Sequence, residues 1–251
     1  MSNGESLQNE HSKMLWHSTR LRMARMVEPH GCDALVDHVF VFRAPHENSW
    51  VKKPVEIGRA LERKETEDNP IVWRLVEVIT QDLLRPQDLD NVEVYSEPVH
   101  LDEADIIPFG TTFQPERSMP DRHELPMDGQ STGTNQAHWF SLKIRWACMI
   151  EGLGCKLFND CIFLVRARDF DAALDRAIVI GRSQEHEYLN GEGERVLWPF
   201  VEVLSLTRMG PGELGDVVDV HTEEVPLRDT DRVPFGTVFH PERSKPEMTG
   251  V

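Results

Sequence analysis

The chain has 251 residues and a formal net charge of -16 at pH 7. This charge disfavours binding to nucleic-acid phosphates, which requires clustered lysine and arginine. No run of the sequence is long and apolar enough for a membrane span, and the polar start lacks a signal-peptide core, so a cytoplasmic protein without a membrane partner is predicted. Four cysteines are too few for a disulfide scaffold at this length. No cysteine or histidine pattern has metal-ligand spacing, so no metal and no cofactor is expected.

The chain contains a tandem repeat. Residues 15–44 align without gaps over 138–167, and IPFGTTFQPERSMP at 107–120 aligns over VPFGTVFHPERSKP at 233–246. A repeat of this length predicts duplicated structural units. The predicted organisation is a disordered tail at 1–13, a first repeat at 14–120, a flexible linker at 121–137, a second repeat at 138–246 and a tail at 247–251.

Both repeats predict the same order of elements. In the second repeat, alternating apolar residues at 140–150 indicate a half-buried strand, and a Gly-Cys turn leads to a second strand at 161–167. Asp169 is placed to cap the helix that follows. In the first repeat the helix is expected at about 54–66, because proline suits a first helical turn.

A third and a fourth strand follow each helix. They are predicted at 71–79 and 92–95 in the first repeat, and at 196–204 and 217–221 in the second. The expected fold is therefore α+β: a tandem duplication of a β-β-α-β-β unit with mostly antiparallel sheets, one helix per repeat and pseudo-twofold symmetry. Each repeat closes with an extended arm that carries Pro-Glu-Arg-Ser.

Several motifs are spread along the second repeat. They are Trp139-Phe140, Leu164-Val165-Arg166-Ala167, the helix alanines, Tyr188-x-Asn190-x-x-Gly193 and Trp198-Pro199-Phe200. Over about seventy residues these motifs resemble a bacterial family of domains of unknown function. The first repeat keeps Trp16, Arg43-Ala44 and Trp73 but lacks the Tyr-x-Asn-x-x-Gly turn, so it is interpreted as a diverged copy. The resemblance implies no activity.

Glu77 and Glu202 are the first candidate site residues. The alternation of the third strand places Glu77 on one face with Trp73, Leu75 and Ile79, and it places Glu202 on one face with Trp198, Phe200 and Leu204. A carboxylate on an apolar face needs a partner, or its pKa rises. It would serve as an acid, a base or a ligand-gripping group, or it would form a structural ion pair with Arg43 or Arg166. The favoured interpretation is structural, either this ion pair or a strand end at which the carboxylate reaches solvent.

The arms provide the remaining candidates. Arg117 and Arg243 have the geometry to clamp a carboxylate or phosphate. The favoured interpretation is structural: the arginines pair locally, while four phenylalanines hold the arms on the core, namely Phe109, Phe113, Phe235 and Phe239. Cys32 and Cys155 occupy matching positions and are interpreted as packed side chains.

The absence of a catalytic motif favours a non-catalytic binding or interaction module with an acidic surface. Its partner would be another protein with a basic surface, in a regulator- or immunity-like role. The first alternative is an enzyme or small-ligand binder with a site between the two repeats. The second is an assembly scaffold, a monomeric pseudo-dimer or a homodimer. The repeats differ most at 50–54 and 185–193, where a specialised function is expected.

Overall fold

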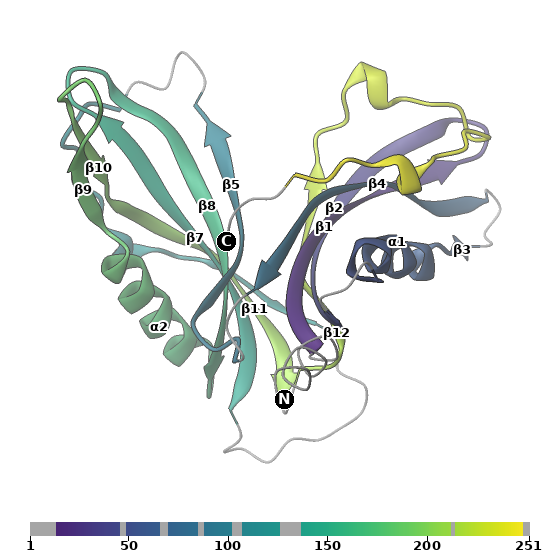
Figure 1. Ribbon diagram of the computed structural model, residues 1–251, viewed down its shortest axis with the longest axis horizontal. Coiled ribbons are helices and arrows are strands. Elements are labelled where there is room, and N and C mark those ends of the chain that lie inside the picture. Colours follow the sequence, from purple (N-terminus) through teal and green to yellow (C-terminus); the bar gives the residue numbers. More distant parts are fainter. Residues whose placement is uncertain are drawn as a thin grey trace, which may run out of the picture. The chain divides into compact units, whose positions relative to one another are not determined.

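The computed structural model describes residues 14–45, 49–65, 70–84, 88–101, 107–125, 137–211 and 214–247. The chain divides into two units, which are described separately (Figure 1). Unit 1 combines Met1–Gln87 with Leu214–Val251, and unit 2 is Asp88–Glu213. The predicted tail at 1–13 lies outside the described residues, as do residues 248–251 of the second tail. In the described ranges, no helix is long and apolar enough to cross a membrane.

Unit 1 is a sheet that carries one helix. The strands β1 (Met14–Val27) and β2 (Gly31–Pro45) form an antiparallel hairpin, followed by α1 (Ser49–Leu61), β3 (Lys64–Glu65) and β4 (Ile71–Leu84). The strand β12 (Val217–Val225) completes the order β12-β2-β1-β4-β3. Ile57 of α1 is buried in a core with Leu21, Met23, Phe40, Phe42, Ala44, Leu75 and Val78.

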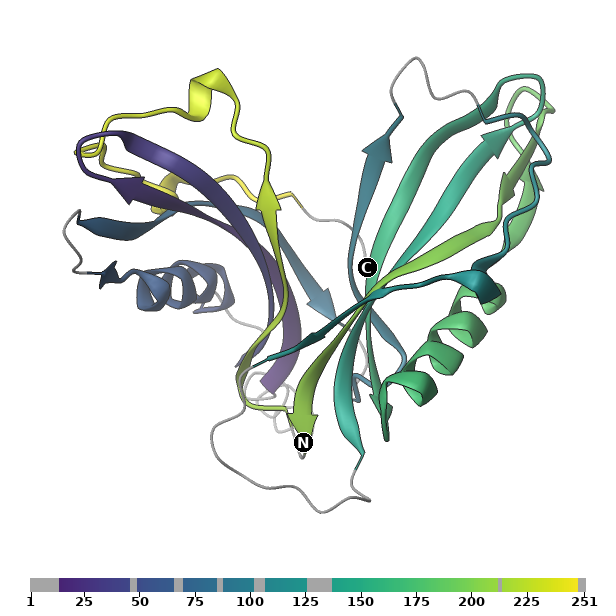
Figure 2. The same ribbon diagram turned by 180° about the vertical axis from the view of Figure 1, so that it is seen from behind.

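Unit 2 has the same plan with additional strands. It contains β5 (Val92–His100), β6 (Asp121–Glu124), β7 (His138–Ile150), β8 (Gly154–Ala167), α2 (Phe170–Ser183), β9 (His186–Leu189), β10 (Arg195–Trp198) and β11 (Phe200–Pro211). Figure 2 shows α2 lying along the sheet of this unit. Ala173 and Ala177 of α2 are fully buried against the sheet. The α+β class, with mostly antiparallel strands and one helix in each half, is confirmed.

Each unit is completed by a strand from the other repeat. The strand β5 belongs to the first repeat and pairs with β8 of the second, whereas β12 of the second repeat pairs with β2 of the first. The colours of Figure 1 show this exchange, with blue β5 among the teal and green strands of unit 2 and yellow-green β12 beside the purple strands of unit 1. Structural units and sequence repeats are therefore different divisions of the chain.

The arms are exchanged in the same way. In unit 1 the Cys32 N–H donates to the Val233 carbonyl at 2.9 Å, and in unit 2 the Cys155 N–H donates to the Ile107 carbonyl at 2.8 Å. Val233, Phe235 and Phe239 pack against a buried cluster of unit 1, so the predicted role of these phenylalanines is confirmed there. Each arm includes one turn of 3-10 helix at Pro-Glu-Arg, η1 (Pro115–Arg117) in unit 2 and η3 (Pro241–Arg243) in unit 1.

The start of α2 agrees with the prediction, and the start of α1 does not. Asp169 caps α2 as predicted, because its Oδ1 accepts a hydrogen bond from the Ala172 N–H at 2.8 Å. The prediction for the first repeat was wrong, since α1 begins at Ser49 and Pro54 lies inside it. A proline in the second helical turn removes one i to i−4 hydrogen bond, and here Pro54 is buried with the face that contacts the sheet.

Two further boundaries differ from the expectation. Asp121–Glu124, expected within the linker, form β6 and pair in parallel with Ser205–Arg208 of β11. The third strand of the second repeat is interrupted at Pro199, whose missing N–H ends β10 before β11 begins.

Candidate functional site

A β-bulge moves Glu77 off the apolar face of its strand. Leu75 pairs with Met23 and Glu77 pairs with Arg22, so Val76 is an extra residue that reverses the alternation. Leu75 is fully buried beneath α1, whereas Glu77 lies on the other face, where its Oε1 accepts from Arg22 Nη1 at 3.2 Å. The predicted face was wrong because it assumed an unbroken period of two.

Glu202 is displaced in the same way. Phe200 pairs with Trp146 and Glu202 pairs with Arg145, with Val201 as the extra residue. Phe200 is fully buried in the core, while Glu202 Oε1 lies 3.8 Å from Arg145 Nη1. The ion-pair partners of the two glutamates are thus arginines of the first strand of each repeat, β1 and β7, and not Arg43 and Arg166.

The two glutamates border a charge network that recurs in both units. Arg22 binds the buried Asp37 through two hydrogen bonds of 2.8 and 2.9 Å. Arg145 binds Asp160 in the same way at 2.7 and 2.8 Å. These bonds raise the pKa of both arginines. The exchanged strands β12 and β5 join this network through the ion pairs Arg20–Glu223 and Lys143–Glu97. The network therefore helps to hold each exchanged strand in its sheet.

The predicted arginines do not converge on one site within either unit. Arg43 lies 4.5 Å over the Trp16 ring, and Arg166 lies 4.6 Å over the Trp139 ring. Arg117 and Arg243 are exposed on their 3-10 turns. Instead, the glutamates beside them contact the helices, with Glu116 bound to Arg182 and Glu242 near Arg59.

The serine of each arm satisfies a backbone group at a bulged strand. Ser118 Oγ accepts from the Val203 N–H at 2.9 Å in unit 2, and Ser244 Oγ accepts from the Val78 N–H at 2.9 Å in unit 1. Each arm then continues alongside the same strand. Covering an unpaired strand edge in this way protects it from pairing with other chains.

The matching cysteines are packing residues at the arms. Burial raises the pKa of the Cys32 and Cys155 thiols. Their sulfurs contact the carbonyls of Ala34 and Leu157. Within the described ranges, no group of three or more histidine, cysteine, aspartate or glutamate residues is arranged to hold a metal ion.

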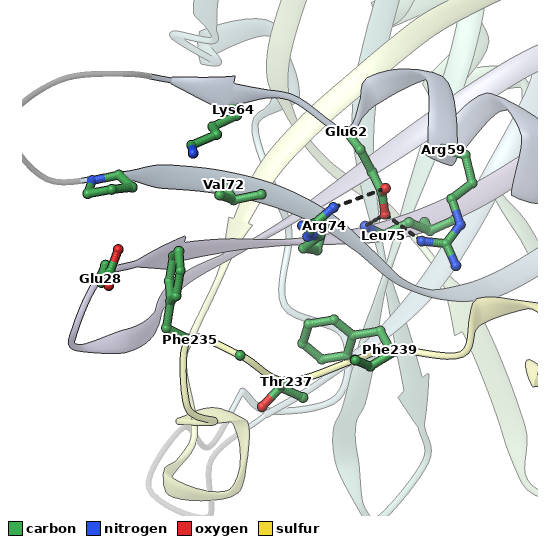
Figure 3. A pocket seen from close by; sticks show the side chains of 13 residues that line it. Glu28, Arg59, Glu62, Lys64, Val72, Arg74, Leu75, Phe235, Thr237 and Phe239 are labelled. Carbon is green, nitrogen blue, oxygen red and sulfur yellow. Dashed lines mark hydrogen bonds and ion pairs between the residues drawn. The ribbon is translucent and has the colours of Figure 1, made fainter.

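A cavity of about 510 Å³ lies beneath the arm of unit 1. Figure 3 shows Phe235 and Phe239 on one side and a cluster around Glu62 on the other. Glu62 accepts from Arg59 at 2.7 Å and from the Leu75 N–H at 3.1 Å, with Arg74 at 3.5 Å.

Unit 2 contains the same contacts between the end of its helix and the strand beside it. Glu185 accepts from Arg182 and from the Phe200 N–H, each at 2.9 Å. The pairs Arg59–Glu62 and Arg182–Glu185 therefore act as a clasp that joins the end of each helix to the third strand. Because the charges of this cluster already bind one another, the cavity beneath the arm is a weaker candidate for a ligand site than its volume suggests.

The aromatic pocket of unit 2 is the stronger candidate. It has a volume of about 340 Å³ and is lined by Glu93, Trp146, Asn159, Cys161, Gln184, His186, Tyr188 and Trp198. The pairing of β9 with β10 places His186 opposite Trp198. His186 stacks at 6.0 Å on both Trp198 and Tyr188, with ring planes within 13°. These three side chains form an aromatic platform.

Two hydrogen bonds hold the walls of the aromatic pocket. His186 Nδ1 lies 2.8 Å from the Gln184 carbonyl at the end of α2. Trp146 is buried, and its Nε1–H donates to the Gly181 carbonyl at 3.2 Å. The polar edge of Trp146 is therefore satisfied within the protein, and the pocket is bounded by its ring.

Glu93 supplies a desolvated acid to the pocket. Burial raises the pKa of Glu93, opposed by hydrogen bonds with Cys161 and Ser96. Burial and the neighbouring Glu93 raise the pKa of Cys161 far above the usual range, so this thiol stays protonated and is no nucleophile. Asn159 Nδ2 also donates to the sulfur at 3.2 Å. A carboxylate beside aromatic ring faces stabilises a positive charge, and the hydrogen-bond partners of Glu93 are neutral, so they do not supply that charge.

Unit 1 has a counterpart pocket of about 320 Å³ that includes His38, Arg63 and Trp73. The exchanged strand again contributes acids, because Glu223 and Glu224 line this pocket. Asp219 of the same strand does not line the pocket, but its Oδ2 lies 2.7 Å from Nδ1 of the lining residue His38. His38 aligns with Cys161, Asp219 with Glu93, Trp73 with Trp198 and Arg63 with His186. In unit 1 the place of the His186 ring is thus taken by an arginine.

A comparison with models of protein families finds a match within the second repeat. Residues 139–221 match the family described as "Domain of unknown function (DUF4288)", and the first repeat is not detected as another copy. The resemblance predicted from the motifs is confirmed for this segment. No curated protein and no solved structure matches the chain. The matched segment contains every lining residue of the aromatic pocket except Glu93, which the first repeat supplies.

Sequence reasoning missed Glu93 and the aromatic platform. A signal for the platform was present, because the repeats differ at 185–193, where β9 lies. Glu93 carried no such signal, since only the exchange of β5 brings it to Cys161.

Proposed function

We propose that the protein is a non-catalytic binding module that holds a cationic group of a basic partner protein in the aromatic pocket of unit 2. The carrying observation is the position of Glu93: a partly buried acid with neutral hydrogen-bond partners, facing an aromatic platform. A cation placed there gains from the ring faces and favours the charged form of the carboxylate. The net charge of -16 favours approach of a basic partner.

Isothermal titration with short peptides tests this function. The probes are a lysine-containing, an arginine-containing and a glutamate-containing peptide, otherwise identical. Both cationic peptides are expected to bind and the acidic peptide is not. Glu93→Gln should weaken cation binding by about tenfold, the effect expected for a partly desolvated charge pair.

A matched control separates the pocket from the general acidity of the surface. Glu187 is exposed, lies on β9 and pairs with Arg195, so Glu187→Gln removes the same charge nearby but outside the pocket. Its effect on affinity should stay below about threefold. Equal losses in the two variants, or no binding of either cationic peptide, would refute the proposal.

The strand exchange supports a second candidate, the assembly scaffold. We infer that the duplicated chain achieves within one molecule what two single-repeat chains would achieve as a dimer that exchanges strands. Sedimentation velocity tests this: a monomer over a wide range of concentrations is expected, and a stable dimer of the full chain would contradict it.

A further inference from the structure

The counterpart pocket of unit 1 shows which group fits this architecture. Arg63 places its guanidinium carbon 5.2 Å over the Trp73 ring, while its Nε donates to Glu65 at 2.8 Å. The backbone holds it there, since the Trp73 N–H donates to the Arg63 carbonyl at 2.8 Å. One repeat of this chain therefore stacks its own guanidinium on the tryptophan that aligns with Trp198.

We infer that the aromatic pocket of unit 2 takes the guanidinium group of an arginine presented by a partner protein. This inference rests on the proposed function and names the cation. His186 replaces Arg63 in the second repeat, so the tryptophan of unit 2 carries a flat ring in place of the chain's own cation.

The aligned acids of the two exchanged strands also differ in their partners. Asp219, which aligns with Glu93, lies 2.7 Å from the pocket residue His38 of unit 1. Glu93 of unit 2 has the Cys161 thiol and the Ser96 hydroxyl as hydrogen-bond partners. The second repeat therefore replaces the permanent cation Arg63 by His186, and it replaces His38 by the thiol of Cys161. An incoming arginine would supply the missing charge.

The aromatic rings and acceptor groups that line the pocket favour guanidinium over ammonium. A guanidinium is planar, weakly hydrated and stacks on aromatic rings, whereas an ammonium is compact and strongly hydrated. It also carries five N–H donors, and the pocket offers acceptors in Glu93 and in the side-chain amides of Asn159 and Gln184. A ligand that stacks on the platform can thus satisfy several donors at once.

Calorimetric titration of the full chain with blocked amino acids tests the choice of cation. N-acetyl-arginine amide is expected to bind at least about tenfold more tightly than N-acetyl-lysine amide. Equal binding of the two would overturn this inference and leave the proposed function standing. If neither they nor the cationic peptides bind, both fall.

Two further probes distinguish the source of the guanidinium. A peptide with one arginine between glycines and serines should bind at least as tightly as the blocked amino acid. Free L-arginine should bind more weakly, because its charged α-ammonium and α-carboxylate groups lose hydration on binding, a cost that the neutral blocked backbone does not carry. Tighter binding of free arginine than of the peptide would overturn the assignment to a partner protein.

The variant His186→Arg reproduces the arrangement of unit 1 inside unit 2. The chain's own arginine should then occupy the platform and weaken binding of the blocked arginine by at least about tenfold. His186→Gln is the control, which removes the ring without adding a charge and should weaken binding of the blocked arginine less than His186→Arg does. Unchanged affinity in His186→Arg, with the variant folded by circular dichroism, would overturn the inference.

Discussion

Gly154 is the residue on which docking of the arm in unit 2 depends most directly. It has a φ of +76°, and a Cβ at this position would lie 2.5 Å from the Ile107 carbonyl oxygen. That oxygen accepts the 2.8 Å hydrogen bond of the Cys155 N–H. We therefore expect Gly154→Ala to displace the arm. Gly152, two residues earlier in the same turn, has a φ of +77° and open space around its Cβ.

The two substitutions Gly152→Ala and Gly154→Ala separate the cost of backbone strain from the cost of a steric clash. Alanine at either position adopts a left-handed conformation that costs about 1–2 kcal/mol. Only Gly154→Ala adds the clash, which costs about 1–3 kcal/mol if the arm shifts, and weakens a hydrogen bond worth about 0.5–1.5 kcal/mol. The free energy of unfolding should fall by roughly 2.5–6.5 kcal/mol in Gly154→Ala, against roughly 1–2 kcal/mol in Gly152→Ala.

Urea unfolding followed by far-UV circular dichroism measures both losses. Limited proteolysis provides a second measurement, since cleavage within 107–120 should accelerate in Gly154→Ala and stay unchanged in Gly152→Ala. Equal destabilisation of the two variants, with equal cleavage rates, would show that the arm does not press on this turn and would refute the reasoning.

Three more predictions follow from the fold and the pocket. Ser118→Ala deprives the Val203 N–H of its acceptor and should cost about 1–3 kcal/mol in urea unfolding, whereas Thr111→Ala, which removes a hydroxyl bond at the exposed surface of the same arm, should cost less than about 1 kcal/mol. A chain cut at a protease site inserted within 126–136 should elute as one complex in gel filtration, because β5 and β12 hold the fragments in each other's sheets; separation of the fragments without denaturant would contradict the exchange. Affinity for the arginine probe should rise as pH increases through the raised pKa of Glu93, because burial favours the protonated acid and the cation requires the carboxylate. Cys161 stays protonated, and a His186→Gln background removes the histidine that lines the same pocket, so Glu93→Gln should flatten the profile in that background; an unchanged profile would exclude Glu93.

The sequence by itself determined the elements that depend on contacts between residues close together in the chain. Asp169 and the spacing of apolar residues after it were sufficient to place α2, and the Gly-Cys turns were sufficient to place the first hairpin of each repeat. Both depend on contacts between residues a few positions apart, which a pattern records directly. The repeat itself and the order of its elements were visible for the same reason.

Only the tertiary structure decided how the strands pair beyond those hairpins. The strands β2 and β8 offer nearly equivalent edges, because they come from matching segments, so the sequence pattern of β5 does not say which edge it joins. The bulges at Val76 and Val201 likewise leave no mark in the apolar pattern, yet they reverse the faces of Glu77 and Glu202. The divergence of residues 185–193 indicated one part of the candidate site in the sequence. The other part, Glu93, reaches the aromatic pocket only because β5 pairs with β8, and the sequence did not predict this pairing.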